Sequence, residues 1–138
     1  MSGPTPLLLS QVRGSALARA AESMLRALGG VEVMLRIPQP AADPRALLGL
    51  GTQAVLDYPI APAIIDGDTA DGGPERFEIL LAATALDRVA SACGAASGVT
   101  LLSNAIAIVV GERVLRIESF TEETFGWAPC FFRVLVSA

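Results

Sequence analysis

Two stretches near the end of the chain decide the fold: Ile106-Ala-Ile-Val-Val-Gly-Glu-Arg-Val-Leu-Arg-Ile-Glu118 and Cys130-Phe-Phe-Arg-Val-Leu-Val136. In the first stretch, Gly111-Glu112 separates two strand-like runs, which indicates a hairpin or a bulged connection. The second stretch is typical of a last strand. We therefore predict a β-meander here, with the upstream segments packing on it or projecting from it. No residue in either stretch has a catalytic pattern.

The strand-like run after the turn has both charged and apolar residues on each of its two faces. Arg113, Leu115 and Ile117 alternate with Val114 and Arg116, which suits a small barrel or an oligomer interface.

Between the two stretches, residues 121–129 are predicted to form a loop that carries Phe125 and Trp127 beside Gly126. Exposed aromatic side chains commonly anchor interfaces. The alternative is that both rings fold back and plug the end of the barrel.

The N-terminal part of the chain predicts a tail over residues 1–6 and an amphipathic helix from Ser10, as its cap, to about Leu28. Gly29-Gly30 ends this helix. Its apolar side chains recur at three- and four-residue spacing, and the expected buried face consists of Val12, Ala16, Leu17, Ala20, Met24 and Leu28. This face packs either on the domain's own core or on a partner.

The middle of the chain reads as strands with one short inserted helix. Pro59 and Pro62 limit residues 60–65 to an edge strand or an extended loop. Thr84 is the expected cap of the inserted helix. The predicted elements are strands at 31–37, 53–58 and 76–82, a helix at 85–93, and one long or two short strands at 99–110 with a break near Asn104.

Two motifs in the middle of the chain have weak ligand signals. Gly49-Leu-Gly51-Thr52 lacks the lysine of a phosphate loop and reads as a plain turn after a short helical turn. Residues 66–74 form a polar loop with Asp66, Asp68 and Asp71, but the calcium-loop spacing fails because its twelfth position is Phe77. We expect no metal there and a projecting, solvated loop.

Composition narrows the function classes. The chain has 138 residues, a net charge of −4, 52% hydrophobic residues, ten arginines and neither histidine nor lysine. Without histidine there is no Ser-His-Asp or Cys-His catalysis and no histidine-ligated metal, and without lysine no Schiff base. The sequence has no basic stripe of the kind that would predict binding to duplex nucleic acid. The surplus of apolar residues favours oligomerisation.

The expected compartment is the cytoplasm in which the chain is made. Cys93 and Cys130 form no CxxC pattern and are expected to be reduced, the alternative being a disulfide. Leu7-Leu-Leu9 is too short for a signal-peptide core, and no apolar run approaches the roughly 20 residues of a membrane span.

The expected fold class is mainly β (α+β): a small antiparallel β-barrel or sandwich with an N-terminal helix and one short inserted helix. Residues 1–30 form the tail and helix, residues 31–138 form the barrel, and together they make one structural domain. We assign no catalytic residue, cofactor or metal.

The order of elements resembles the head–tail joining (head-completion, neck) proteins of tailed bacteriophages, of the lambda type, over roughly residues 31–136. The matching features are Val55-Leu-Asp-Tyr-Pro59 before a variable polar loop, a strand that runs into a Thr-initiated turn at 77–89, and the ending of strand, turn, strand, acidic loop and last strand at 106–136. The chain departs from the family pattern in lacking the Gly-Asp turn before the penultimate hairpin, and residues 93–102 are extra.

The resemblance implies a structural virion protein that is made in the host bacterial cytoplasm. It would assemble as a homo-oligomeric ring between portal or adaptor and tail proteins, with DNA passing through the lumen without sequence-specific binding and with no membrane involved. By exposure, the expected partner contacts are Leu7, Leu8, Leu9, Asp66, Asp68, Asp71, Phe125 and Trp127.

Two alternatives remain open. The first is a tail terminator or tail-tube component of a phage or phage-like particle. The second is a small ligand-binding barrel or an enzyme that uses Asp57, Asp66 or Glu78, because paired carboxylates can perform acid–base chemistry. Nothing in the sequence fixes two of these carboxylates together.

Overall fold

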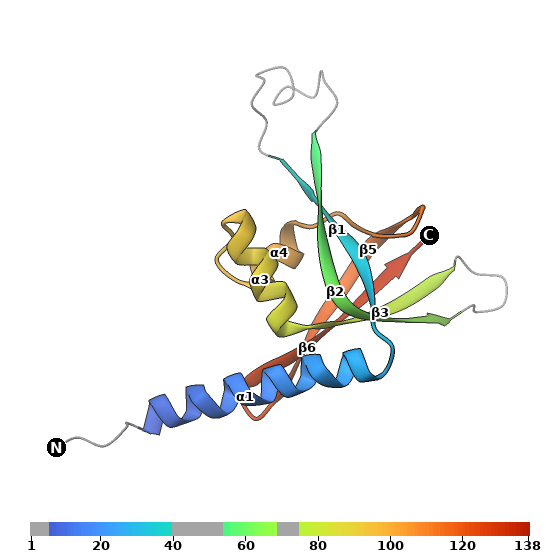
Figure 1. The fold of residues 1–138 in the computed structure, drawn as a ribbon. Helices are drawn as coiled ribbons and strands as arrows, with labels where there is room; N and C mark the ends of the chain where they lie inside the picture. Colours follow the sequence, from blue (N-terminus) through green and yellow to red (C-terminus); the bar gives the residue numbers. More distant parts are fainter. Residues whose placement is uncertain (1–5, 40–53, 69–74) are drawn as a thin grey trace.

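The computed structural model describes residues 6–39, 54–68 and 75–138, with side chains from Ala16 onward except that of Asp68. Its centre is a closed barrel of six strands in the order β1-β2-β3-β6-β5-β4, and all neighbouring strands are antiparallel (Figure 1). This confirms the predicted mainly β class with a barrel. The strands are β1 (Val31–Pro38), β2 (Val55–Asp68), β3 (Arg76–Ala82), β4 (Ala107–Val110), β5 (Arg113–Phe125) and β6 (Ala128–Ser137).

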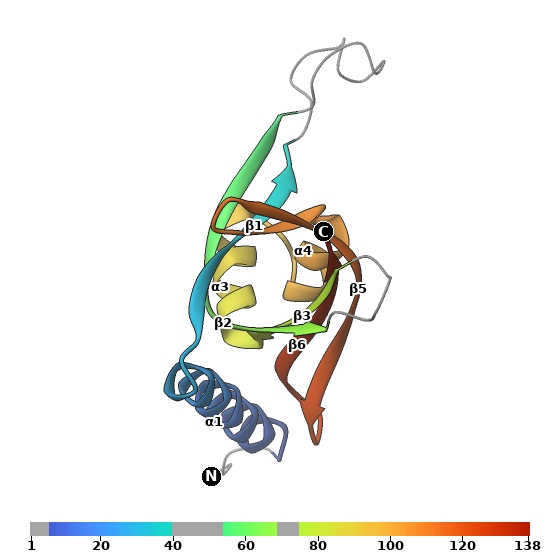
Figure 2. The same cartoon turned by 90° about the vertical axis from the view of Figure 1, so that its right-hand side faces the viewer.

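Three helices accompany the barrel within the described residues: α1 (Pro6–Ala27), α3 (Ala83–Cys93) and α4 (Gly98–Asn104). Seen along the barrel axis, α3 and α4 lie inside the outline of the strands, and in the side view both lie at one end (Figures 1 and 2). They therefore cover one end of the barrel. The helix α1 runs along the outside and packs mainly on β6.

Strict alternation along the strands fills the barrel. Leu35, Ile79, Leu81, Ile108 and Val134 are all fully buried, because successive side chains of a strand point to opposite faces. The helix α3 adds Leu86, Val89 and Ala90 to the same core.

Two hairpins extend beyond the barrel in opposite directions (Figures 1 and 2). One is the β1–β2 arm, whose last pair is Pro38 with Val55. The other is the β5–β6 hairpin, which continues past the point where β4 stops pairing, at Arg116. The molecule thus presents two projecting two-stranded elements.

The predicted start and buried face of the first helix are wrong. Residue Ser10 lies inside α1, which begins at Pro6. The buried side chains are Ala18, Ala21, Glu22 and Leu25, whereas Leu17, Met24 and Leu28 are exposed. More than half of the helix circumference is apolar or small, so periodicity alone could not choose between adjacent stripes.

The strand predicted at 53–58 and the edge strand or loop expected at 60–65 form one continuous strand, β2. Among residues 60–65, only Ala63 pairs on both sides, so the edge-strand expectation fits this stretch. Pro59 lies opposite Met34, on a stretch that has a neighbour on one side only. Pro62 follows a cis peptide bond with Ala61 and lies at the register shift where β2 passes from β1 to β3. Edges and bulges are the places where a sheet tolerates proline.

Residues 98–104 form a helix and not the predicted strand, and Asn104 is its last residue. The side chain of Ser97 caps α4 by accepting a hydrogen bond from the Thr100 N–H at 3.2 Å. The prediction that Thr84 caps the inserted helix is also wrong. Thr84 lies within α3, whose N-cap is Ala82, and this cap makes no side-chain hydrogen bond.

Two predicted loops are partly strand. Residues 121–125 belong to β5 and Ala128 already belongs to β6, so the predicted loop at 121–129 is only a Gly126-Trp127 turn. Asp66, Gly67 and Asp68 end β2. The predicted tail covered residues 1–6, but Pro6 begins α1, and residues 1–5 lie outside the described residues. The predicted turn at 41–52 and the remainder of the polar loop, including Asp71, also lie outside them.

Candidate interaction surfaces

The tip of the β5–β6 hairpin carries two exposed aromatic rings. Phe125, the last residue of β5, is 60% exposed and Trp127, in the turn, is 71% exposed. The turn is tight because Gly126 adopts a positive φ of 64°, which glycine tolerates without a steric penalty. The rings point away from the core, so the alternative that they plug the barrel is wrong.

A second apolar feature lies on α1. Leu17, Met24 and Leu28 are 46%, 48% and 67% exposed. Their spacing of seven and four residues places them on one line along the helix. Because α1 packs on the barrel through the adjacent stripe, this line has no cover in the described part of the chain.

The elements that carry these two features are neighbours in the fold. The turn between β5 and β6 is close to α1 in both views (Figures 1 and 2). We use the name α1–hairpin surface for Leu17, Met24, Leu28, Phe125 and Trp127. Such a group of large exposed apolar side chains is the usual signature of a protein contact.

The other predicted contact residues lie elsewhere or are not described. Leu7, Leu8 and Leu9 belong to the first turns of α1, but their side chains lie outside the description. Asp66 is opposite Glu78, and Asp68 is opposite Arg76, at the end of β2. This end lies away from the β5–β6 turn in both views (Figures 1 and 2), so the predicted residues form no single site.

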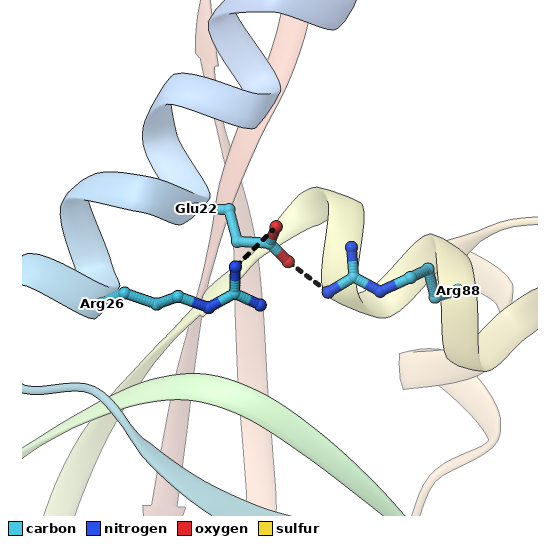
Figure 3. Close-up of polar contacts among 3 residues, drawn as sticks. All are labelled: Glu22, Arg26 and Arg88. Atoms are coloured by element: carbon cyan, nitrogen blue, oxygen red, sulfur yellow. Dashed lines mark hydrogen bonds and ion pairs between the residues drawn. The ribbon is translucent and has the colours of Figure 1, made fainter.

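One ion pair, between the buried Glu22 and the exposed Arg88, connects α1 to α3, and the sequence analysis missed it. The carboxylate of Glu22 accepts a hydrogen bond from Arg88 of α3 and lies 3.6 Å from Arg26 one helical turn away (Figure 3). The hydrogen bond from Arg88 keeps the pKa of Glu22 below its ordinary value, although burial opposes this. The partners are 66 positions apart, so no local signal reveals the pair.

Arginine also pairs with several carboxylates on the strands. Arg36 donates to both oxygens of Asp57 at 2.9 and 3.1 Å, and this hydrogen bonding lowers the pKa of Asp57. Arg133 contacts Glu78 at 2.8 Å and Glu123 at 3.2 Å. These pairs connect neighbouring strands across the outside of the barrel.

The enzyme alternative named three carboxylates, and the structure brings two of them together. The structure places Asp66 directly opposite Glu78, a proximity that the sequence did not predict. However, Glu78 is bound by Arg133, Asp57 is bound by Arg36, and all of them lie at the surface. General acid–base catalysis needs a positioned group beside a bound substrate, and this pair lies on an outer sheet face.

A shallow groove runs between β2 and α3 and has a volume of about 220 Å³. Tyr58, Ile60, Arg88 and Val89 are among its lining residues. Sites for small molecules usually enclose roughly 300–1,000 Å³, so this groove is small for a ligand pocket.

Both cysteines are free thiols, with Cys130 buried and Cys93 half-buried. In the described ranges, no group of three or more histidine, cysteine or carboxylate side chains could hold a metal ion. Nor does any helix of these ranges have the length and apolarity needed to cross a bilayer.

Comparison with known proteins found no match to a protein family, to a curated protein or to a solved structure.

Proposed function

We propose that this chain is a non-enzymatic structural subunit of a virion, a head–tail connector (neck, head-completion) protein that assembles into a ring between portal and tail. The observation that carries the proposal is the α1–hairpin surface. Two large aromatic rings and a line of apolar helix side chains stay in contact with water in the isolated chain.

Leaving these side chains in water forgoes a large stabilisation. Burying apolar area gains about 25 cal/mol per Å², and an aromatic side chain can bury 150–250 Å². Aromatic anchors on a projecting hairpin are well placed to insert into a neighbouring subunit. The surface therefore supports a role in assembly more strongly than a role in small-molecule chemistry.

The choice of a phage neck among assemblies rests on the resemblance in the order of strands, turns and acidic segments. The negative net charge of −4 agrees with a ring through which DNA passes without being held. A tail terminator or tail-tube subunit would use the same kind of surface, and its different position in the particle separates it from a neck protein.

The direct test is electron microscopy of purified particles from the source, with this chain carrying a C-terminal tag that a labelled antibody detects. A neck protein places the label between portal and tail. Label along the tail or at its far end would favour the tail alternatives, and particles without the chain would contradict a virion role.

A paired set of variants tests the surface itself. We expect Phe125→Ser combined with Trp127→Ser to abolish incorporation into particles while the melting temperature of the isolated chain changes little, since both rings are exposed. The matched control is Val114→Ser, an exposed apolar residue of β5 near the other end of the hairpin. Equal incorporation of both variants would contradict the role of the α1–hairpin surface.

A further inference from the structure

The second half of β5 has a free edge. The pairing of β5 with β4 ends at Arg116, and the Ile117 N–H donates to the Ile106 carbonyl at 3.3 Å. Beyond this point, Glu118 lies in a register shift and residues Ser119 to Phe125 pair with β6 alone among the described strands. In Figure 2 this part of β5 is the outermost strand on its side of the hairpin.

A free edge leaves backbone groups without partners. In an antiparallel pair, alternate residues direct their N–H and C=O groups away from the neighbouring strand. Such a row is a template for another extended chain. Register shifts occur between Ile117 and Ser119 and between Glu123 and Thr124, so Ser119–Glu123 is the regular part of this template.

Proline occurs on another free edge of the sheet but not on this one. The outer side of β2 is also unpaired before Ala63, and there Pro59 and Pro62 remove two backbone N–H groups. Proline is one of the devices by which proteins block edge-to-edge pairing. No proline occurs between Glu118 and Phe125.

The charge of the free edge specifies the occupant. Glu118, Glu122 and Glu123 are its only charged residues. Arg76 lies 3.9 Å from Glu118 and Arg133 lies 3.2 Å from Glu123, whereas Glu122 has no ion-pair partner within the described ranges. A second copy of this edge would bring acidic residues together, which costs affinity, while a basic strand would neutralise them.

We propose that the β5 edge, defined as Glu118–Phe125, is a strand-addition site for an extended segment of a partner protein that carries Lys or Arg. Main-chain hydrogen bonds supply the affinity, as in other strand-addition complexes. Glu122 selects the positive charge of the incoming strand. The inference does not depend on the proposed virion role, because it concerns the backbone geometry of one strand.

The test uses the full chain and synthetic eight-residue peptides as probes. The first peptide alternates Arg with Thr or Val, and the second has Glu in place of Arg. Two further versions of the basic peptide carry N-methyl groups on its odd or on its even amides. Binding is measured at low salt by fluorescence polarisation, and hydrogen exchange locates the amides that become protected.

We expect the basic peptide to bind, to protect alternate amides of Glu118–Phe125, and to lose binding when one of the two sets of amides is methylated but not the other. The Glu122→Lys variant should bind it roughly fivefold more weakly, as expected for an exposed ion pair. The matched control Glu112→Lys makes the same charge change in the exposed β4–β5 turn and should bind it nearly as well as the unaltered chain.

Four results would overturn the proposal. These are no binding of the basic peptide at millimolar concentration, equal binding of both methylated versions, equal binding of the acidic peptide, and protection outside the β5 edge. Protection of the same amides by self-association of the chain, without peptide, would assign the edge to a second copy instead.

Discussion

At the scale of single residues, Glu22 shows how one carboxylate fixes the position of a helix. It is buried on α1 and held by Arg88 of α3. A buried carboxylate without a partner would be strongly destabilising, and the hydrogen bond from Arg88 offsets part of that penalty. The ion pair therefore allows α1 to turn this side toward the barrel although the adjacent stripe is more apolar.

The Glu22→Gln variant should lower the free energy of unfolding at pH 7 by about 1–2 kcal/mol. A hydrogen bond to a charged group contributes about 1.5–3 kcal/mol, and the exposure of Arg88 reduces this contribution. The pKa of Glu22 lies below its ordinary value of 4.5 in the folded chain. Its contribution is thus present above pH 4.5 and is lost as the pH falls through the lowered pKa. Urea unfolding at several pH values measures both effects.

The control for this prediction is Arg26→Ala, since Arg26 is exposed and makes only the longer, 3.6 Å contact. It should cost less than 1 kcal/mol. The role of the ion pair would be contradicted by a Glu22→Gln variant that keeps full stability at pH 7 and loses stability at acidic pH just as the unaltered chain does.

Gly30 allows the close approach of α1, β1 and the bulge of β2. A Cβ atom at this position would lie 2.6 Å from the Cβ of Pro62 and 2.9 Å from the Leu25 carbonyl oxygen. Neither neighbour is a flexible side chain. We expect Gly30→Ala to destabilise the fold by roughly 1–3 kcal/mol through overpacking, measured by thermal or urea unfolding, and unchanged stability would contradict this contact.

At the scale of elements, α1 is the clearest case in which pattern and packing disagree. The sequence predicted Leu17, Met24 and Leu28 as buried, and the structure buries Leu25 and Ala21 instead. The deciding interactions, with Arg88 and with β6, come from segments far along the chain. Local periodicity can predict that a helix is amphipathic, but the packing partner decides which of two apolar stripes is covered.

Two leucines on α1 test this orientation. Leu25→Ala should reduce the free energy of unfolding by about 2–5 kcal/mol because Leu25 is fully buried. Leu28→Ala, three residues away and largely exposed, should change it by no more than about 0.5 kcal/mol. Urea unfolding of the two variants measures the difference, and similar losses would mean that α1 is rotated relative to this description.

Helix α4 was missed for a different reason. The run Val99-Thr-Leu-Leu102 contains β-branched residues, which favour strands. The Ser97 cap and the burial of Leu101 and Leu102 beside α3 outweigh that weak preference. By contrast, the strand at 76–82 and the turn at Gly111-Glu112 were predicted correctly, because alternation and turn chemistry are local signals.

At the scale of the whole molecule, the barrel closes through its shortest seam. Strands β1 and β4 share only the pairs Met34–Val109, Leu35–Ile108 and Arg36–Ala107. The seam between β3 and β6 runs from the Arg76–Ser137 pair to the Ala82–Phe131 pair. Fewer ladder hydrogen bonds protect the first seam, so the barrel has a definite weak point.

Native-state hydrogen exchange should reveal this seam. We expect the amides of β4 that face β1 to exchange through a partial opening, with a lower free energy than the amides between β3 and β6. The β3–β6 amides serve as the internal reference. Equal exchange free energies at both seams would show that the barrel opens only as a unit.

The barrel class could be predicted because alternation and turns mark the last three strands. The closed strand order could not, since it depends on pairings such as β1 with β4 that connect distant segments. The sequence singled out Phe125 and Trp127 but placed both in a loop and left open whether they are exposed, whereas Phe125 is the last residue of β5. Their exposure and their closeness to α1 follow from the continuation of β5 and β6 beyond the barrel, which no local pattern shows.

Strand β2 gives the molecule a mechanical property. It is one uninterrupted strand of 14 residues, which corresponds to about 46 Å at 3.3 Å per residue. Its first half belongs to the projecting arm, and its second half belongs to the barrel wall beside β3. A force applied to the arm at the Pro38–Val55 pair is therefore transmitted along one continuous backbone to the barrel wall. The register shift near Pro62 is the point at which we expect the strand to bend.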